Sequence, residues 1–439
     1  MGNLVSMIFS PSSQVSQVAL DYEAKEKSKD KESGKTKKII ISFDGTGGEP
    51  EWGIQNEEKV KNGTLAFDAN GLSNISKGHL LVGGSLENSG RSIDDQLALY
   101  YSGVGTRGKV IAQVRAGLNL GTMTDIYMMA VEDLEICYNE GDELYVFGFS
   151  RGAATARLFA SYLDRTGLNI DGKQINPNIK FLGVYDTVPD ALSRGYINTG
   201  SRQLDVNYDS WFTMWQAESS LPKNVEKVIH LIALDELRFA FRPTQFNEDE
   251  RVTEVWCAGC HTDVGGGYYY DGLSDGSFTY MLHEAMKAGL VYRTITEDTV
   301  KNDPHSLIGN DQKLRDAIDY DQDLIIEPNP TDPNVHNEDL MMYKVTNAVS
   351  GFVHRLVCKI KDDETVTDEP VLVLDNVIDR INDKQKKLKN LNLDNSQYTA
   401  KGYRPQNLKG RKYRIVNSQD GTISEVYDGI ENNIDVPWD

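Results

Sequence analysis

Residues Gly148 to Gly152 read Gly-Phe-Ser-Arg-Gly and stand between the apolar run 144–147 and a helix-like run over 153–163. A strand, a Gly-x-Ser-x-Gly turn and a helix in this order form a nucleophile elbow. The spacing has a steric reason. The serine sits at a sharp turn with strained dihedral angles, and the glycines leave room where strand and helix nearly touch. The pattern predicts Ser150 as a nucleophile, with an ordinary glycine-serine turn as the alternative interpretation.

His261 is the best candidate for the base that such a serine needs. A serine hydroxyl is a weak nucleophile until an imidazole takes its proton, and the imidazole in turn needs a carboxylate to fix its tautomer and stabilise its charged form. His261 follows the strand-like run 253–258 and precedes three consecutive glycines at 265–267. This setting predicts a ring exposed at the end of a strand, while a structural histidine is the alternative.

Two aspartates are candidates for the acid, Asp186 and Asp235, and each follows a strand-like run. Position alone favours Asp186 only narrowly. Asp235 is followed by Glu236 and Arg238, which also suits a structural ion pair. With either aspartate the chain order is Ser, Asp, His, as in α/β-hydrolases.

Two backbone N–H groups are expected to bind the oxyanion that forms during acyl transfer. One belongs to Arg151, directly after the nucleophile, and the other to the loop after the first core strand, where Gly45 or Thr46 is placed for it. The alternative is that residues 44–47 form a turn and nothing more.

No metal or cofactor is predicted. Cys257 and Cys260 with His261 match the string that attaches c-type haem, but they lie in an apolar strand, and the chain start lacks the expected export signal. No second Cys/His pair follows at zinc-ligand spacing. The glycines at 45–48 and 103–105 lack the Gly-Lys-Ser/Thr ending of a phosphate-binding loop.

Strand-like runs alternate with helices or long connections, which predicts a mainly parallel sheet with helices on both faces. The expected strands are 38–43, 96–101, 144–147, 179–185, 225–234 and 253–258, and the expected helices 109–138, 153–163 and 277–290. In the first helix, Ile126, Ala130, Leu134 and Cys137 fall on one face. Chemistry collects at the carboxyl ends of such strands, which here carry Asp44, Ser150, Asp186, Asp235 and His261.

The composition narrows the classes of partner. The chain has 439 residues and a net charge of −20, which disfavours nucleic acid and simple adsorption on anionic lipid. No apolar run has the length of a membrane span, and the first residues lack a Sec-type signal. Four cysteines make no disulfide framework in so long a chain. Because of the negative net charge, a lipid substrate would be recognised by a pocket and an apolar lid, and the protein would contact the membrane only transiently.

Three regions are expected. Residues 1–37 are predicted to be a mobile tail, whose Met1-Gly2 start matches the N-myristoylation pattern and would matter only in a eukaryotic context. Residues 38–294 are the predicted catalytic domain, in which the excursions 49–95 and 190–222 carry the lid and pocket. Residues 295–439 form a C-terminal extension packed on the core, with an amphipathic run at 371–381.

Six blocks of sequence occur in an order that resembles one family. They are Ser-Phe-Asp-Gly-Thr-Gly at 42–47, Tyr-Tyr-Ser-Gly-Val-Gly-Thr at 100–106, Gly-Phe-Ser-Arg-Gly-Ala at 148–153, Gly-Val-Tyr-Asp-Thr-Val at 183–188, Ala-Leu-Asp-Glu at 233–236 and His-Thr-Asp-Val-Gly-Gly-Gly-Tyr at 261–268. Together they resemble the α/β-hydrolase domain of bacterial type VI secretion lipase effectors and their fungal relatives. The resemblance covers roughly residues 38–290.

This resemblance implies a serine esterase, most specifically a phospholipase of A1 or A2 type that acts as an antibacterial or host-directed effector. It places the triad on Ser150, Asp186 and His261, which favours Asp186 over Asp235. It implies a cytoplasmic protein of the producer that a type VI system delivers to a target cell, with a secretion-system component and a cognate immunity protein as partners. Two alternatives stay open: a non-catalytic binding module on a hydrolase scaffold, and an esterase or thioesterase for small soluble acyl compounds.

Overall fold

The computed structural model describes most of the region between residues 34 and 292 and parts of the remainder. The described residues are 19–20, 22–23, 27, 30, 34–45, 71–84, 92–93, 95–103, 123–188, 221–238, 241–268, 271–292, 326–331, 354–361, 366–383, 398–399 and 402–432. The excursion predicted over 190–222 lies almost entirely outside this set, and so does most of 49–95.

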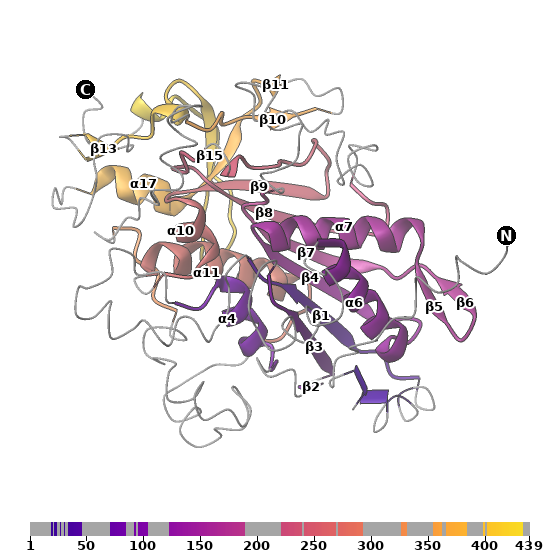
Figure 1. Cartoon of the computed structure of the whole chain (residues 1–439). Coiled ribbons are helices and arrows are strands. Elements are labelled where there is room, and N and C mark those ends of the chain that lie inside the picture. Colours follow the sequence, from indigo (N-terminus) through magenta and orange to yellow (C-terminus); the bar gives the residue numbers. More distant parts are fainter. Residues whose placement is uncertain are drawn as a thin grey trace, which may run out of the picture.

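A large, mainly parallel sheet forms the centre of the described structure (Figure 1). Its strands are β1 (Lys38–Phe43), β2 (Ser92–Ile93), β3 (Gln96–Tyr101), β4 (Glu143–Phe149), β7 (Ile179–Tyr185), β8 (Val228–Ala233), β9 (Val252–Cys257), β12 (Val371–Leu374), β15 (Lys412–Val416) and β16 (Tyr427–Asp428). Their spatial order is β16-β15-β12-β9-β8-β7-β4-β1-β3-β2. Neighbours from β15 to β3 run parallel, and the edge strands β16 and β2 pair antiparallel.

Shorter elements surround the sheet. Three two-stranded antiparallel pairs are β5 (Leu168–Ile170) with β6 (Lys173–Ile175), β10 (Lys359–Ile360) with β11 (Val366–Thr367), and β13 (Tyr398–Thr399) with β14 (Gly402–Tyr403). The helices are α4 (Asn74–Leu81), α6 (Met123–Cys137), α7 (Arg151–Arg165), α10 (His261–Gly265), α11 (Gly272–Lys287) and α17 (Asp375–Asn382), with 3-10 turns η3 (Gln406–Leu408) and η4 (Ile430–Asn432). No described helix has the length and apolarity needed to cross a bilayer.

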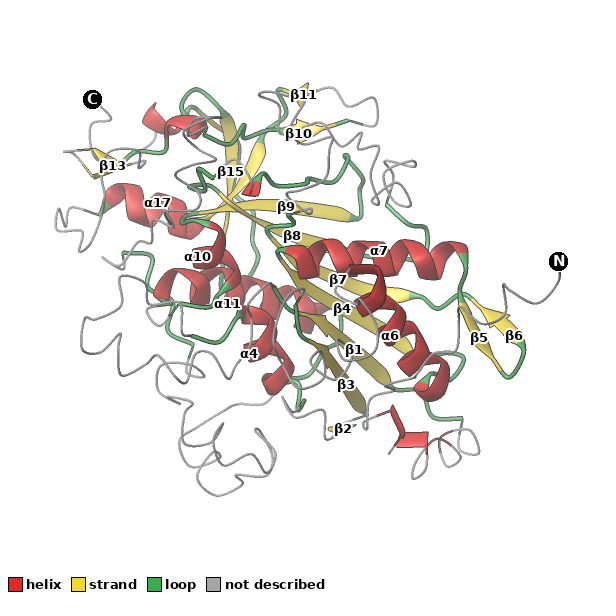
Figure 2. Cartoon of the chain, in the orientation of Figure 1, coloured by secondary structure: helices red, strands yellow, loops and turns green. Residues whose placement is uncertain are grey.

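The helices cover both faces of the sheet (Figure 2). Side chains from α6 and α7 pack on one face, and side chains from α4 and α11 pack on the other. This arrangement confirms the α/β-hydrolase-like class predicted from the alternation of strands and helices. The predicted helical face of Ile126, Ala130, Leu134 and Cys137 is buried in α6.

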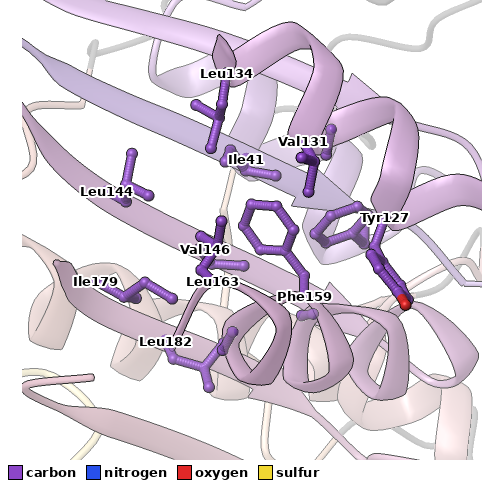
Figure 3. Close-up of a cluster of buried hydrophobic side chains, with 14 of the residues drawn as sticks. Ile41, Tyr127, Val131, Leu134, Leu144, Val146, Phe159, Leu163, Ile179 and Leu182 are labelled. Carbon is purple, nitrogen blue, oxygen red and sulfur yellow. The ribbon is translucent and has the colours of Figure 1, made fainter. Parts of the chain in front are cut away.

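The central strands are apolar along both faces because each face lies under a helical layer. In β1, Ile39 and Ile41 point into the core beneath α6 and α7, whereas Ile40 points to the opposite core. Figure 3 shows Phe159 of α7 next to Ile41 of β1 and Val146 of β4. Phe159 is fully buried, and burial of such a side chain contributes about 1.5–3 kcal/mol.

Residues beyond 294 take part in the same sheet. β12 pairs with β9 in parallel, and β15 pairs with β12. The run 371–381, expected to be one amphipathic element, divides into strand β12 and helix α17. Its first four residues, Val-Leu-Val-Leu, suit a strand, and Asp375 begins a helix whose Val377 and Ile381 are buried.

Part of the N-terminal segment packs on the core. Ala19 and Tyr22 are buried in the cluster beneath α6 and α7. The Tyr22 hydroxyl donates a hydrogen bond to Asp30, and the Lys37 ammonium lies 4.4 Å from the centroid of the Tyr22 ring. Two residues of the segment predicted as a tail therefore contact the core, and most of the rest of residues 1–33 lies outside the described residues.

Candidate active site

Ser150 occupies the sharp turn between β4 and α7. Its backbone angles are φ 58° and ψ −123°, outside the regions that residues with a side chain prefer. Among the described non-glycine residues only Asp95, Ser150, Asp171 and Asp186 have positive φ. The turn is held by hydrogen bonds on both sides, since the Ser150 N–H donates to the Tyr185 carbonyl (3.0 Å) and its carbonyl accepts from the Ala153 N–H (3.1 Å). Strain of this kind persists only where the surroundings enforce it.

The two glycines of the motif sit where strand and helix nearly touch. A Cβ atom on Gly148 would lie 2.5 Å from the Gly152 carbonyl oxygen and 2.7 Å from the Ala153 Cα. On Gly152 it would run into the carbonyl oxygens of Phe43 and Asp44. The Gly-x-Ser-x-Gly spacing is therefore a packing requirement of this junction.

Asp186 directly follows the neighbouring strand β7, and its φ is also positive, at 39°. Its carboxylate is fully buried and accepts hydrogen bonds from several directions. Oδ2 lies 2.5 Å from His261 Nδ1, and Oδ1 accepts from the Ala233 N–H (3.0 Å). Arg355 donates from one guanidinium nitrogen to Oδ1 (2.6 Å) and from the other to Oδ2 (2.9 Å).

These partners keep Asp186 ionised. Burial alone would raise the pKa of this carboxyl, but the positive charge of Arg355 and the hydrogen bond from His261 outweigh it. The pKa of Asp186 therefore lies well below its ordinary value. A buried carboxylate in this state can hold one tautomer of the imidazole, with the proton on Nδ1.

His261 is the first residue of α10, a five-residue helix where the sequence suggested only a glycine turn. Its ring lies between two aromatic rings, with centroid distances of 4.7 Å to Phe149 and 4.9 Å to Phe241. Its backbone N–H donates to Glu236 (3.2 Å). Among the described residues, Nε2 has no hydrogen-bond partner. A hydrogen bond from Ser150 to Nε2 is thus not formed here, and in hydrolases without substrate this bond is often long.

Asp235 lies in a different environment. Both its carboxylate oxygens accept from the Tyr403 hydroxyl (2.8 Å each), and Oδ2 accepts from the Gly259 N–H (2.7 Å). Burial raises the pKa of Asp235 to about 7 despite these hydrogen bonds. An ion pair was the alternative interpretation of Asp235, but the ion pair with Arg238 is formed by the neighbouring Glu236, at 2.7 Å. The structure thus brings Asp186, and not Asp235, to the His261 ring.

The loop after β1 is organised by Asp44. This buried carboxylate accepts hydrogen bonds from Ser73 (2.7 Å), Ser76 (2.7 Å) and the Tyr100 hydroxyl (2.5 Å). It also accepts from the Gly45 N–H at 2.6 Å, so that donor is already engaged. Thr46, the other predicted loop donor, lies outside the described residues. Arg151, the remaining predicted donor, is the first residue of α7, so its N–H belongs to a helix N-terminus, which favours negative charge.

The described residues contain no group of three or more His, Cys, Asp or Glu side chains placed to hold a metal ion. All four cysteines are buried, and none forms a disulfide. Cys257 is the last residue of β9, and Cys260 directly precedes α10.

Comparison with known proteins now defines the family. The sequence model described as T6SS, phospholipase effector Tle1-like, catalytic domain matches residues 37–176 and 169–284, more than half of the chain. The chain belongs to the Tle1-like family. The match begins just before β1 and ends within α11, so it contains Ser150, Asp186 and His261.

Individual relatives of this Tle1-like chain are distant. An uncharacterized protein of Saccharomyces cerevisiae is 28% identical over 249 residues, which cover 49% of this chain and 33% of the yeast protein. A solved Tle1 effector bound to the VgrG spike of the type 6 secretion system is 18% identical, with a TM-score of 0.38 over 73% of this chain and 84% of that one. An uncharacterized protein from Pseudomonas aeruginosa is 15% identical, with a TM-score of 0.36 over 68% of this chain and 53% of that one. This chain therefore spans about a third of the yeast relative and about half of the Pseudomonas one.

One residue of the Tle1-like site was absent from the candidates that the sequence offered. Arg355 contacts Asp186 from 169 positions away and lies beyond the family match. The local sequence Val-His-Arg-Leu-Val-Cys carried a weak signal, since an arginine among apolar residues suggests a buried ion pair. It gave no indication of the partner.

Proposed function

We propose that this Tle1-like protein is a serine esterase whose catalytic triad is Ser150, Asp186 and His261. The observation that carries the proposal is the hydrogen bond of 2.5 Å between His261 Nδ1 and the buried Asp186 carboxylate, at the same edge of the sheet as the strained Ser150 turn. Asp235, the other candidate for the acid, contacts Tyr403 and Gly259 instead.

In the proposed reaction, the Ser150 hydroxyl attacks the acyl carbonyl of an ester while His261 Nε2 takes its proton. The negative charge of Asp186 orients the ring and stabilises the imidazolium that forms. The alcohol leaves with the proton from Nε2, and water then enters, is deprotonated by His261, and hydrolyses the acyl-enzyme. The mechanism needs no metal or cofactor.

The oxyanion is proposed to bind the Arg151 N–H and one N–H of the loop after β1. Thr46 is favoured over Gly45 for the second donor, because the Gly45 N–H already donates to Asp44. The hydrogen bonds around Asp44 hold this loop close to Phe149, the residue before the nucleophile. A Cβ atom on Gly45 would lie 2.7 Å from the Phe149 ring.

The proposed substrate is a phospholipid, cleaved at one acyl ester as by an A1 or A2 phospholipase. The family description supports this class, and the net charge of −20 favours a pocket over a charged surface as the means of recognition. Residues 38–294 would supply the triad, and residues 295–439 would complete the sheet and the site. By analogy with the effector solved on its spike, we propose delivery from the producer's cytoplasm by a type VI system, with a spike component and a cognate immunity protein as partners.

The test is a hydrolysis screen of vesicles made from single phospholipid classes, comparing the wild type with Ser150→Ala. Free fatty acid and lysolipid are both quantified, and lipids with different acyl chains at the two positions report which ester is cleaved. The proposal expects equal amounts of both products from the wild type and neither from Ser150→Ala. Cleavage of p-nitrophenyl butyrate without lipid cleavage would instead assign a small-ester hydrolase, and neither activity would assign a binding module.

A further inference from the structure

Arg355 is a buried cation that contacts the candidate acid Asp186. Only 3% of its surface is exposed, and its guanidinium reaches the carboxyl end of β7 from a segment outside that sheet. Besides the two hydrogen bonds to Asp186, it donates to the Ala233 carbonyl (2.6 Å) and to the Phe241 carbonyl. Ala233 ends β8, and Phe241 packs on the His261 ring. Arg355 therefore contacts Asp186 and also the two segments, at Ala233 and Phe241, that lie beside His261.

The geometry of the contact fixes both oxygens of Asp186. Two parallel N–H···O bonds from a planar guanidinium hold a carboxylate in one plane, which a single ammonium does not do. This orientation matters because Asp186 has a strained φ of 39° and must aim Oδ2 at His261 Nδ1. The Ala233 N–H fixes Oδ1 from the other side.

We propose that Arg355 is a positioning residue of the active site: it orients the Asp186 carboxylate toward His261 as its buried counter-charge, so that the C-terminal part of the chain completes the triad. The inference rests on the proposed function of Ser150, Asp186 and His261. Arg355 acts through Asp186 and does not contact the reacting atoms.

The charges around this pair agree with the assignment. Glu236 also experiences the positive charge of Arg355, but its ion pair is with Arg238, at 2.7 Å. Without Arg355, the partners that the described residues give the buried Asp186 carboxylate would be His261 and the Ala233 N–H. A buried carboxylate that loses its cation tends to take up a proton, and a neutral Asp186 no longer stabilises an imidazolium.

The experiment compares Arg355→Met and Arg355→Lys with Arg404→Met in the full-length protein. Arg404 is a matched control, because it is a buried arginine of the same C-terminal part that donates to the Ile381 and Tyr403 carbonyls, away from the triad. The kcat and KM for p-nitrophenyl butyrate are measured per folded molecule, with the folded fraction taken from circular dichroism and thermal unfolding.

Arg355→Met is expected to lower kcat by about 100-fold or more with KM nearly unchanged, because a displaced Asp186 misaligns the base. Arg355→Lys, which keeps the charge and loses the planar fork, should recover part of that loss. Arg404→Met is expected to keep kcat within about threefold of the wild type even if its unfolding temperature falls. A kcat of Arg355→Met as high as that of Arg404→Met would overturn the proposal.

A double-mutant cycle covers the case in which Arg355→Met fails to fold. Asp186→Asn/Arg355→Met removes both buried charges and leaves neither unpaired, so it is expected to fold. If Arg355 acts through Asp186, this double variant has the same kcat as Asp186→Asn alone. A further large loss of kcat in the double variant would contradict the inference.

The two proposals fail in different ways. If Ser150→Ala retains the wild-type rate, or the wild type cleaves no ester, the proposed function fails. If Ser150→Ala is inactive while Arg355→Met is fully active, the proposed function stands and only the role of Arg355 is overturned.

Discussion

At the scale of single residues, two buried aspartates at the ends of adjacent strands have opposite properties. Asp186 faces a guanidinium and an imidazole, which together lower its pKa in spite of burial. Asp235 faces a tyrosine hydroxyl and a backbone N–H, and burial raises its pKa to about 7. An aspartate is thus kept ionised in one place, whereas in the other it exchanges its proton near neutral pH.

Replacement of each aspartate by asparagine separates these roles. We expect Asp186→Asn to lower kcat for ester hydrolysis by about 10³–10⁴-fold, because the amide favours the wrong tautomer of His261. Asp235→Asn should lower kcat less than about tenfold, since its contacts are with Tyr403 and Gly259. Steady-state kinetics on p-nitrophenyl butyrate decide the matter, and a larger loss at Asp235 would reverse the assignment.

The raised pKa of Asp235 also predicts a dependence of stability on pH. An acid with a folded pKa of about 7 and an ordinary unfolded pKa near 3.8 favours the folded state below the lower value. That contribution is lost as pH rises from about 3.8 through 7, because the unfolded chain releases the proton first. Asp235→Asn should therefore show a smaller fall in unfolding temperature between pH 5 and pH 8 than the wild type. An identical fall in both proteins would mean that Asp235 does not titrate in this range.

At the scale of elements, the junction of β4 and α7 depends on close backbone contact. Gly152→Ala would place a methyl group against the carbonyl oxygens of Phe43 and Asp44. We expect it to destabilise the fold by about 1–3 kcal/mol, as overpacking does, and to lower kcat by displacing Ser150. Urea unfolding and kinetics measure both effects.

The matched control for this junction is Gly276→Ala in α11. A Cβ atom there would lie 3.6 Å from Asn376 Nδ2, an ordinary contact, and alanine favours a helix over glycine by up to about 1 kcal/mol. This variant should be as stable as the wild type or more so. Equal stability of Gly152→Ala and Gly276→Ala would show that the junction tolerates a side chain.

The elements around the elbow were predictable from sequence because their signals are local. The run 144–147 before Ser150 is apolar without interruption, as in a strand buried on both faces, and α6 repeats its apolar residues with a helical period. The division of 371–381 into β12 and α17 was missed because four apolar residues in a row fit either element. Residues 371–374 form a strand because they pair with β9, which lies more than a hundred residues away in the sequence.

The positions of the candidate site residues in the sheet were predictable for a similar reason. Ser150, Asp186 and His261 each end a strand or begin the element after it, so a parallel sheet places them at one edge. The position of Arg355 could not be predicted in this way, because Arg355 follows no strand of the sheet. Its contact with Asp186 forms only in the folded tertiary structure. The hydrogen bond from the Gly45 N–H to Asp44 could not be predicted either, because it depends on the orientation of the Asp44 side chain.

At the scale of the whole molecule, the C-terminal part is structurally continuous with the region that the family match covers. β12 covers the edge of β9, and Val373 packs in one cluster with Trp256 and Ile232. Together with Arg355, these contacts tie the triad region to residues beyond 354. An isolated 38–294 region would therefore expose the unpaired edge of β9 to solvent. It would also leave the buried Asp186 carboxylate without its cation, Arg355.

Truncation after residue 294 tests this dependence. We expect the truncated chain to be insoluble or to lack a cooperative thermal transition, measured by circular dichroism beside the full-length protein. A soluble fragment with a sharp transition and full esterase activity would mean that the C-terminal part is dispensable for both the fold and the site.

The central claim is that Ser150 is an activated nucleophile, and its reaction with a fluorophosphonate probe tests this most directly. The probe is added to the folded full-length protein, and the site of modification is found by peptide mass spectrometry. We predict one adduct, on Ser150, with none in Ser150→Ala and slower labelling in Asp186→Asn. A wild-type protein that stays unlabelled, or an adduct that persists in Ser150→Ala, would contradict the account.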